Sequence, residues 1–157
     1  MTEGLGQLKN LKILKLDLSE CADSFSKHEV PARLKDAFEG LTSLQEFHLV
    51  VSLPVSHKQA FIELLEALQE LHNINTLNLK LFATANDPYT KAVFEPYIDH
   101  STLLESIEDM VLHLSKLHTL CMSFESRIIR NPDKFKEIPS HIKGLKVGLE
   151  NCVIESF

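Results

Sequence analysis

One recurring leucine pattern constrains this chain more than any other feature. It is complete in residues 8–18, which read L-x-x-L-x-x-L-x-L-x-L. The second half of this stretch alternates apolar and polar residues, which is the period of a strand with one buried face. The pattern occurs five times, at Leu11, Leu14, Leu16, Leu18; Leu44, Phe47, Leu49, Val51; Ile74, Leu77, Leu79, Leu81; Leu117, Leu120, Met122, Phe124; and Ile142, Leu145, Val147, Leu149.

The copies begin 33, 30, 43 and 25 residues apart, which is the range of a repeat array. The last three positions of the five copies are apolar throughout, although only 44% of the chain is. The first four copies also carry a leucine three residues earlier, at Leu8, Leu41, Leu71 and Leu114, whereas the fifth has Pro139. A single repeat cannot bury its apolar face, so the copies are predicted to stack.

The segments between these strands change to the period of a helix. The first predicted helix has an apolar stripe from Val30 to Leu41, and the second runs from a capping box at Ser56 and Gln59 to Leu71. The third begins near Thr102 and ends near Leu114, and a short fourth begins at Asn131 and is ended by Pro139. Strand and helix therefore alternate over residues 1–157, which predicts one α/β domain with a parallel sheet and helices on one face.

The leucine pattern and this alternation resemble the leucine-rich-repeat superfamily in its ribonuclease-inhibitor-like α/β form. The resemblance covers residues 5–152 and is carried by residues 8–18, 41–51 and 71–81. It implies a right-handed βα solenoid of about five irregular repeats, with a concave parallel sheet and convex helices. The asparagine that the family has after its L-x-L pair is replaced here by Ser19, Ser52, Phe82, Glu125 and Glu150, so longer strands and an irregular horseshoe are expected.

The polar residues between the core leucines are predicted to form three rows on the concave face. The rows are Ile13, Glu46, Thr76, Thr119 and Gly144; Lys15, His48, Asn78, Cys121 and Lys146; and Asp17, Val50, Lys80, Ser123 and Gly148. Such a chemically mixed face is typical of a protein-binding solenoid. All of these residues except the two glycines are predicted to bind a partner, although each one alone is more often a merely solvated strand residue.

An insertion near residues 82–100 accounts for the longest spacing. It contains both tyrosines of the chain, Tyr89 and Tyr97, and the prolines Pro88 and Pro96 favour a short extra helix between them. Insertions in repeat proteins often lie on the binding side, and aromatic side chains with a polar tip suit contact surfaces. The insertion is therefore a second predicted binding segment, with its phenylalanines left open between contact and edge-covering roles.

Composition excludes several partners and locations. The net charge of −6 and the pI of about 5.7 argue against nucleic-acid binding, which needs a basic surface. No apolar run is long enough to cross a membrane, so no membrane partner is expected. The three cysteines are too scattered for a disulfide framework, which indicates a reducing, cytoplasmic location. No histidine or cysteine spacing indicates a metal, and no phosphate-binding motif indicates a cofactor.

A catalytic role is considered and rejected. Cys121, Asn78 and His48 share one predicted row and have the residue types of a cysteine hydrolase. His48 would lie two strands from Cys121, or about 10 Å away, whereas a nucleophile and its base need about 3 Å. The chain is therefore predicted not to be an enzyme.

Two functional hypotheses remain. The first is a non-enzymatic adaptor or scaffold module that binds a protein partner, of unidentified kind, through the concave face and the insertion. The second is a structural subunit, or a fragment of a longer array, that contacts its neighbours end to end. Residues 2–7 resemble the tail of a preceding helix that is too short to cap the array, and this feature motivates the second hypothesis.

Overall fold

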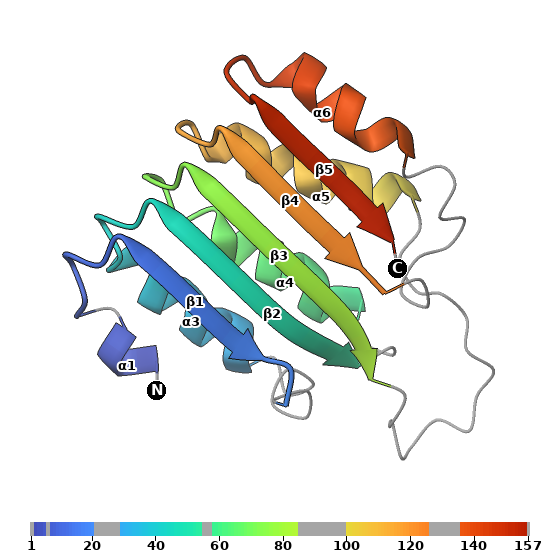
Figure 1. Cartoon of the computed structure of the whole chain (residues 1–157). Coiled ribbons are helices and arrows are strands. Elements are labelled where there is room, and N and C mark those ends of the chain that lie inside the picture. The colour runs from blue at the N-terminus through green and yellow to red at the C-terminus, as the bar shows by residue number, and fades with distance from the viewer. Residues whose placement is uncertain are drawn as a thin grey trace.

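The computed structural model describes residues 2–5, 7–20, 29–54, 58–84, 100–125 and 136–156 (Figure 1). Strands and helices alternate along the chain. The elements are α1 (Thr2–Leu5), β1 (Ile13–Leu18), α3 (Glu29–Glu39), β2 (Glu46–Pro54), α4 (Lys58–Leu68), β3 (Thr76–Thr84), α5 (His100–His113), β4 (Thr119–Phe124), α6 (Ile138–Leu145) and β5 (Asn151–Ser156).

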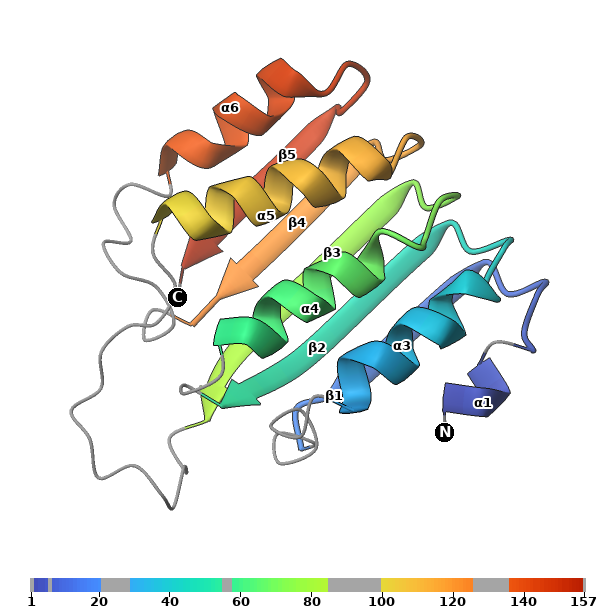
Figure 2. The same cartoon turned by 180° about the vertical axis from the view of Figure 1, so that it is seen from behind.

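The five strands form one parallel sheet in the order β1-β2-β3-β4-β5, so each strand lies beside its neighbour in the sequence. Figures 1 and 2 show α3, α4, α5 and α6 on one face of this sheet, while the other face carries no described helix. The predicted α/β class, with a parallel sheet and helices on one side, is therefore confirmed. We refer to the uncovered side as the open face.

Each strand is preceded by the same tight turn. The backbone N–H of Leu11 donates to the Leu8 carbonyl at 3.0 Å, and the turns before β2, β3 and β4 repeat this bond at 3.0–3.1 Å between Leu44 and Leu41, Ile74 and Leu71, and Leu117 and Leu114. One carbonyl at the start of each strand then accepts two consecutive N–H groups of the next strand, as Lys12 does from Gln45 and Glu46 at 2.8 and 3.0 Å. The repeated sequence thus produces repeated backbone geometry.

The Asn73 side chain joins three successive turns. Its Nδ2 donates to the Thr42 carbonyl at 2.7 Å, and its Oδ1 accepts from Lys116 Nζ at 2.6 Å. Satisfying backbone groups at a solvent-exposed turn is worth about 1 kcal/mol per hydrogen bond, so the contribution to stability is small. The more important consequence is positional, because the side chain holds the turns of three neighbouring units in one line.

The core lies between the sheet and the helices. The inward-facing columns of β2, β3 and β4 are 0–2% exposed, and they meet the buried faces of α3, α4 and α5. Phe38 of α3 packs edge-on against Phe47 of β2 at 5.3 Å, and Phe61 of α4 packs against Phe124 of β4 at 6.1 Å. Burying such aromatic pairs is a large share of core energetics. The predicted apolar stripes are confirmed from Leu34 to Leu41 and from Phe61 to Leu71, whereas in α5 Leu103 is buried and Leu104 only half-buried.

The fifth repeat was placed wrongly by the sequence pattern. Residues 138–145 form helix α6, and the fifth strand is Asn151–Ser156, with Cys152 and Ile154 beside Leu120 and Met122. Val147, predicted to be buried, is 98% exposed. The error has a physical cause: Ile138, Ile142 and Leu145 of α6 are spaced by four and three residues, so two helical turns imitate the leucine pattern seven residues before the strand.

Two boundaries also differ from the prediction. Pro139 lies in the first turn of α6 and begins that helix instead of ending one, in keeping with the preference of proline for such positions. β3 continues to Thr84, so Phe82 belongs to the strand and not to the insertion. Strand length does not follow the residue at the asparagine place, because β2, with Ser52 there, has nine residues like β3, while β4, with Glu125, has six like β1. Residues 131–135 of the predicted fourth helix lie outside the described residues.

Candidate functional site

The open face carries the three predicted rows across the first four strands. Glu46, Thr76 and Thr119 are register partners of Ile13, and equivalent pairings hold for the rows of Lys15 and Asp17. The register thus brings together twelve of the predicted binding residues, which are Ile13, Lys15, Asp17, Glu46, His48, Val50, Thr76, Asn78, Lys80, Thr119, Cys121 and Ser123. These side chains are half-buried or exposed, unlike the alternating core positions on the same strands.

Lys146, the thirteenth predicted residue of the face, lies elsewhere. It follows the last residue of α6, where its N–H donates to the Ile142 carbonyl at 3.1 Å. Its own carbonyl accepts from Leu149 at 3.3 Å, so Lys146 occupies the turn position that leucine holds before the other four strands. The residue is only 8% exposed, and burial lowers the pKa of its ammonium group. The fifth members of the rows are instead Asn151, Val153 and Glu155.

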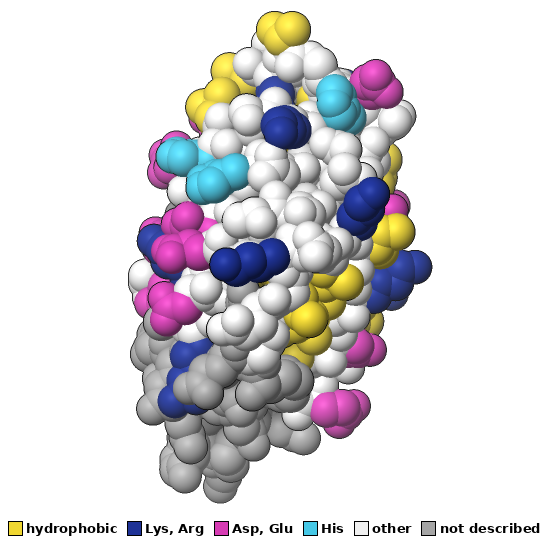
Figure 3. All heavy atoms as spheres, turned by 90° about the vertical axis from the view of Figure 1, so that its left-hand side faces the viewer, with side chains coloured by type: hydrophobic (Ala, Val, Ile, Leu, Met, Phe, Trp, Pro, Cys, Tyr) yellow, Lys and Arg dark blue, Asp and Glu magenta, His cyan; other side chains and the backbone are white. Residues whose placement is uncertain are grey.

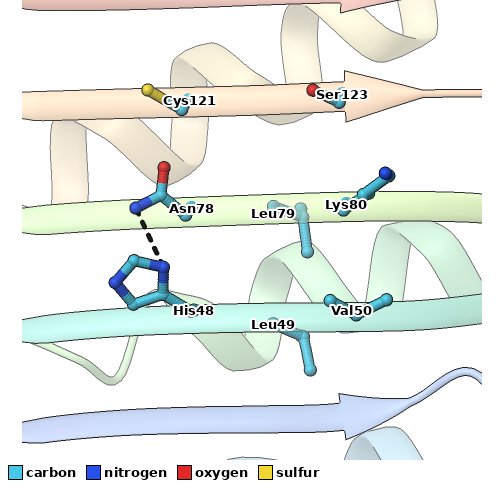
Figure 4. Close-up of a pocket in the computed structure, with 8 residues that line it drawn as sticks. All are labelled: His48, Leu49, Val50, Asn78, Leu79, Lys80, Cys121 and Ser123. Atoms are coloured by element: carbon cyan, nitrogen blue, oxygen red, sulfur yellow. Dashed lines mark hydrogen bonds between the residues drawn. The ribbon is translucent and has the colours of Figure 1, made fainter. Parts of the chain in front are cut away.

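A hollow of about 360 Å³ lies at the centre of the open face. Three neighbouring strands, β2, β3 and β4, supply its lining, which consists of His48, Leu49, Val50, Asn78, Leu79, Lys80, Cys121 and Ser123 (Figure 4). Leu49 and Leu79 are buried core residues, so the groups that a ligand would meet are the open-face side chains between them. Because these side chains alternate along rigid strands, the sheet holds their positions.

A chain of three side chains orders one end of the hollow. Asn78 Nδ2 donates to His48 Nδ1 at 3.1 Å, and His48 Nε2 lies 2.5 Å from Glu46 Oε1 (Figure 4 shows the first bond). An amide nitrogen can only donate, so Nδ1 accepts and the ring proton is on Nε2, which donates to the carboxylate. The imidazole is therefore held in one tautomer and one orientation by a side chain on each side.

The other end of the hollow combines charges of both signs. Lys80 Nζ lies 5.1 Å from the centre of the Phe82 ring, which is a cation–π contact on the same strand. Ser123 Oγ donates to Glu155 Oε1 at 3.0 Å, which brings a carboxylate of β5 to the margin of the hollow. A ligand would thus meet an ammonium group, a hydroxyl and a carboxylate within a few strand spacings.

This arrangement does not provide an activated nucleophile. Burial and the nearby Glu155 carboxylate raise the pKa of the Cys121 thiol, which disfavours the reactive thiolate. Both ring nitrogens of His48 are engaged by Asn78 and Glu46, so neither is directed to Cys121. The register places the two residues two strands apart, with Asn78 between them. The hollow is chemically suited to binding through hydrogen bonds and charge.

Three contributors to the face, Asn151, Val153 and Glu155, were missed in the sequence. All three lie on β5, and Val153 is 47% exposed. A spacing of 32 residues from Leu117 to Leu149 would have found them, because it is close to the first two spacings. The signal was weak because the corresponding columns hold Lys146, Cys152 and Ser156 in place of large apolar residues.

The predicted insertion contacts, Tyr89 and Tyr97, lie outside the described residues. Within the described ranges, no group of three or more histidine, cysteine, aspartate or glutamate side chains could hold a metal ion. The described helices include none that is long and apolar enough to cross a membrane. Comparisons with protein-family models, curated proteins and solved structures found no match to this chain.

Proposed function

We propose that this chain is a non-enzymatic adaptor or scaffold module that binds a protein partner on the open face, centred on the hollow between β2 and β4. One observation carries the proposal: the described helices cover only one face of the sheet, and the other face presents ordered polar side chains around a hollow. Strand residues on a rigid sheet form a preorganised surface, which reduces the entropy lost on binding.

We infer further that the architecture is a leucine-rich-repeat solenoid of the ribonuclease-inhibitor-like kind. The consecutive parallel strands, the recurring turn and the paired hydrogen bonds to one carbonyl support this inference. The free thiols of Cys121 and Cys152 are in keeping with a reducing, cytoplasmic location. The insertion tyrosines, Tyr89 and Tyr97, remain proposed contacts of the same partner.

The partner is expected to present hydrogen-bonding and charged groups of both signs. The Glu46–His48–Asn78 chain offers a fixed polar surface at one end, and Lys80 and Glu155 offer opposite charges at the other. Side chains that are already ordered in the free protein cost little further entropy when a partner binds. Loss of Lys80 or His48 is therefore expected to weaken the complex more than loss of an exposed helix residue.

The test compares two matched double variants of the chain. His48→Ala with Lys80→Ala removes one imidazole and one ammonium group from the hollow. His113→Ala with Lys143→Ala removes the same groups from the exposed sides of α5 and α6. In quantitative affinity capture from the source cell, partners are expected to bind the unmodified chain and the helix variant and to be lost from the hollow variant.

The same comparison is then repeated with the purified partner by calorimetry. Equal affinities for all three proteins would contradict the proposal, because the hollow would then make no contribution to binding. Circular dichroism of each variant checks that the fold is intact, which is expected since the four substituted side chains are exposed or half-buried.

The alternative hypothesis, a structural subunit that contacts neighbours through its ends, is favoured by a feature of β1. Leu14 and Leu16 stand in core columns of the edge strand β1 but are only half-buried, whereas the core residues of the other edge strand, Cys152 and Ile154, are buried.

A further inference from the structure

β1 forms one edge of the sheet, and its core side is incompletely covered. Leu14 and Leu16 are half-buried, whereas their register partners Phe47 and Leu49 are 0% and 1% exposed. Ile13, on the open face of the same strand, is 52% exposed. Figure 3 shows a patch of hydrophobic side chains on the side of the molecule that carries β1 and the turns before the strands. An edge strand with exposed apolar residues is a template for pairing with another strand.

Charge is distributed unevenly along this edge. The first half of β1 and the residues before it carry three bases, Lys9, Lys12 and Lys15. The second half of β1 and the residues after it carry two acids, Asp17 and Glu20. All five side chains are exposed. A strand that is basic in its first half and acidic in its second half is complementary to itself when two copies run in opposite directions.

We propose that β1 pairs antiparallel with β1 of a second copy of this chain, with Leu16 opposite Leu16 at the two-fold axis. This register places Lys15 opposite Asp17 twice on the open face, with both residues inside β1. On the helix side it places Leu14 opposite Leu18. The two sheets become one continuous sheet, and the half-buried leucines of each copy cover those of the other.

Other ways of covering this edge are less favourable. A register displaced by two residues, with Lys15 opposite Lys15, sets like charges against each other. A register displaced by one residue turns the leucines of the second copy to the open face. Addition of a neighbour's β5 in parallel, continuing the observed register, would place Glu155 beside Asp17, which again opposes like charges. The charges therefore favour a closed, two-fold pair over an open chain of copies.

The pairing leaves the hollow free. The two-fold axis is perpendicular to the sheet, so the helices of both copies lie on one side and both open faces lie on the other. α1 lies beside α3 in the helix layer and not in the plane of the sheet (Figures 1 and 2). The dimer thus presents two hollows on one surface, and its formation does not depend on the proposed function of the hollow.

The test uses two single charge reversals in the full chain, measured by sedimentation velocity across a range of protein concentrations. In a dimer of Lys15→Asp, the new carboxylate at position 15 lies opposite Asp17 of the other copy. In a dimer of Asp17→Lys, the new ammonium group at position 17 lies opposite Lys15 of the other copy. Because each reversal changes two attractive pairs into two repulsive ones, each variant is expected to dimerise about tenfold more weakly, or worse, than the unmodified chain.

A mixture of the two variants provides the decisive comparison. In the mixed dimer, the acids at positions 15 and 17 of the Lys15→Asp chain lie opposite the bases at positions 17 and 15 of the Asp17→Lys chain. Equal amounts of the two variants are therefore expected to form a heterodimer that is tighter than the homodimer of either variant. Lys143→Asp, the same charge reversal on α6, serves as the control and is expected to dimerise like the unmodified chain. Native mass spectrometry identifies the mixed species.

Three results would overturn the proposal. The unmodified chain sedimenting as a monomer at every concentration would exclude the dimer. Dimerisation unchanged by both reversals would exclude this edge. Stronger association of Asp17→Lys would indicate parallel pairing with Glu155 of a neighbour's β5, because that substitution turns the like-charge contact into an attraction.

Discussion

The two edges of the sheet differ in how completely they are closed. At β5, Leu149, Cys152 and Ile154 are 6–8% exposed, and the eight-residue helix α6 packs beside the strand. At β1, the preceding helix α1 is a single turn of four residues, and Leu14 and Leu16 remain half-buried. The comparison teaches that a strand at the edge of such a sheet is covered by the helix before it, and that one helical turn is not enough.

Leucine truncation is expected to show the largest difference between the edges. Leu149→Ala removes a side chain that is 7% exposed and should lower the free energy of unfolding by about 2–4 kcal/mol. Leu14→Ala removes a half-buried side chain and should cost about 1 kcal/mol, because part of its surface is already in water. Urea unfolding measures both values at a concentration where the chain is monomeric.

Leu112→Ala provides the baseline for this comparison, since Leu112 is 58% exposed on α5, and it should change the stability by less than about 0.5 kcal/mol. Equal costs at Leu149 and Leu14 would show that the two edges are covered alike and would contradict the comparison.

Alkaline pH is expected to weaken the β5 edge in particular. Burial raises the pKa of the Cys152 thiol from its ordinary value of 9.0 to about 11. Between these values the folded chain keeps a proton that the unfolded chain has released, so stability falls as the pH rises, by up to about 2 kcal/mol. Unfolding of the unmodified chain at pH 8 and above measures the slope.

Cys152→Ala should flatten this alkaline slope. Cys121→Ala should flatten it less, since the Cys121 thiol is half-buried on the open face. If the slope persists unchanged in Cys152→Ala, a titrating group other than Cys152 causes the pH dependence of stability, and the prediction is wrong.

Lys146 offers a smaller effect at the same edge. It stands at a turn position that is leucine before the other four strands, and burial lowers the pKa of its ammonium group. Lys146→Met keeps the unbranched stem and removes the desolvated charge, so it should raise the free energy of unfolding by about 1 kcal/mol. Lys143→Met on the exposed side of α6 is the matched control and should leave stability unchanged. A loss of stability in Lys146→Met would show that the ammonium group is needed.

The smallest expected effect is at β1. The Ser19 hydroxyl and the Ser19 N–H, which lies 2.9 Å from Asp17 Oδ1, lower the pKa of the Asp17 carboxyl. Its stabilising contribution is therefore present above the ordinary carboxyl pKa and is lost as the pH falls through the lowered one. Asp17→Asn should be slightly less stable than the unmodified chain at neutral pH and equal to it in acid. An NMR titration that finds an ordinary pKa for Asp17 would remove the basis of this prediction.

Much of the fold was predictable because the inward columns of β1 to β4 are filled by large apolar residues with period two. Such columns determine both the strands and their register, and the register in turn determined twelve residues of the open face. The fifth unit was not predictable in this way. Lys146 and Cys152 dilute its pattern, and the helical spacing of Ile138, Ile142 and Leu145 gives a better apolar match seven residues too early.

The site was predictable as a surface but not as a set of interactions. Period-two alternation predicted that His48, Asn78 and Cys121 share a row. It did not indicate that Asn78 would donate to His48, or that Glu46 would accept from the same ring, because side-chain torsions decide these contacts. The short segment 2–7 indicated an incompletely capped edge at β1, but the leucine pattern did not, since the half-buried Leu14 and Leu16 have the same pattern as fully buried leucines on neighbouring strands.

Amide hydrogen exchange at two protein concentrations tests most directly the claim that β1 is the unfinished edge at which a second copy pairs. We predict that amides of β1 exchange faster than those of β3 in dilute solution and become slower as the concentration rises, whereas amides of β5 do not change. Exchange at β1 that is independent of concentration, or slowing that occurs at β5 as well, would contradict the account.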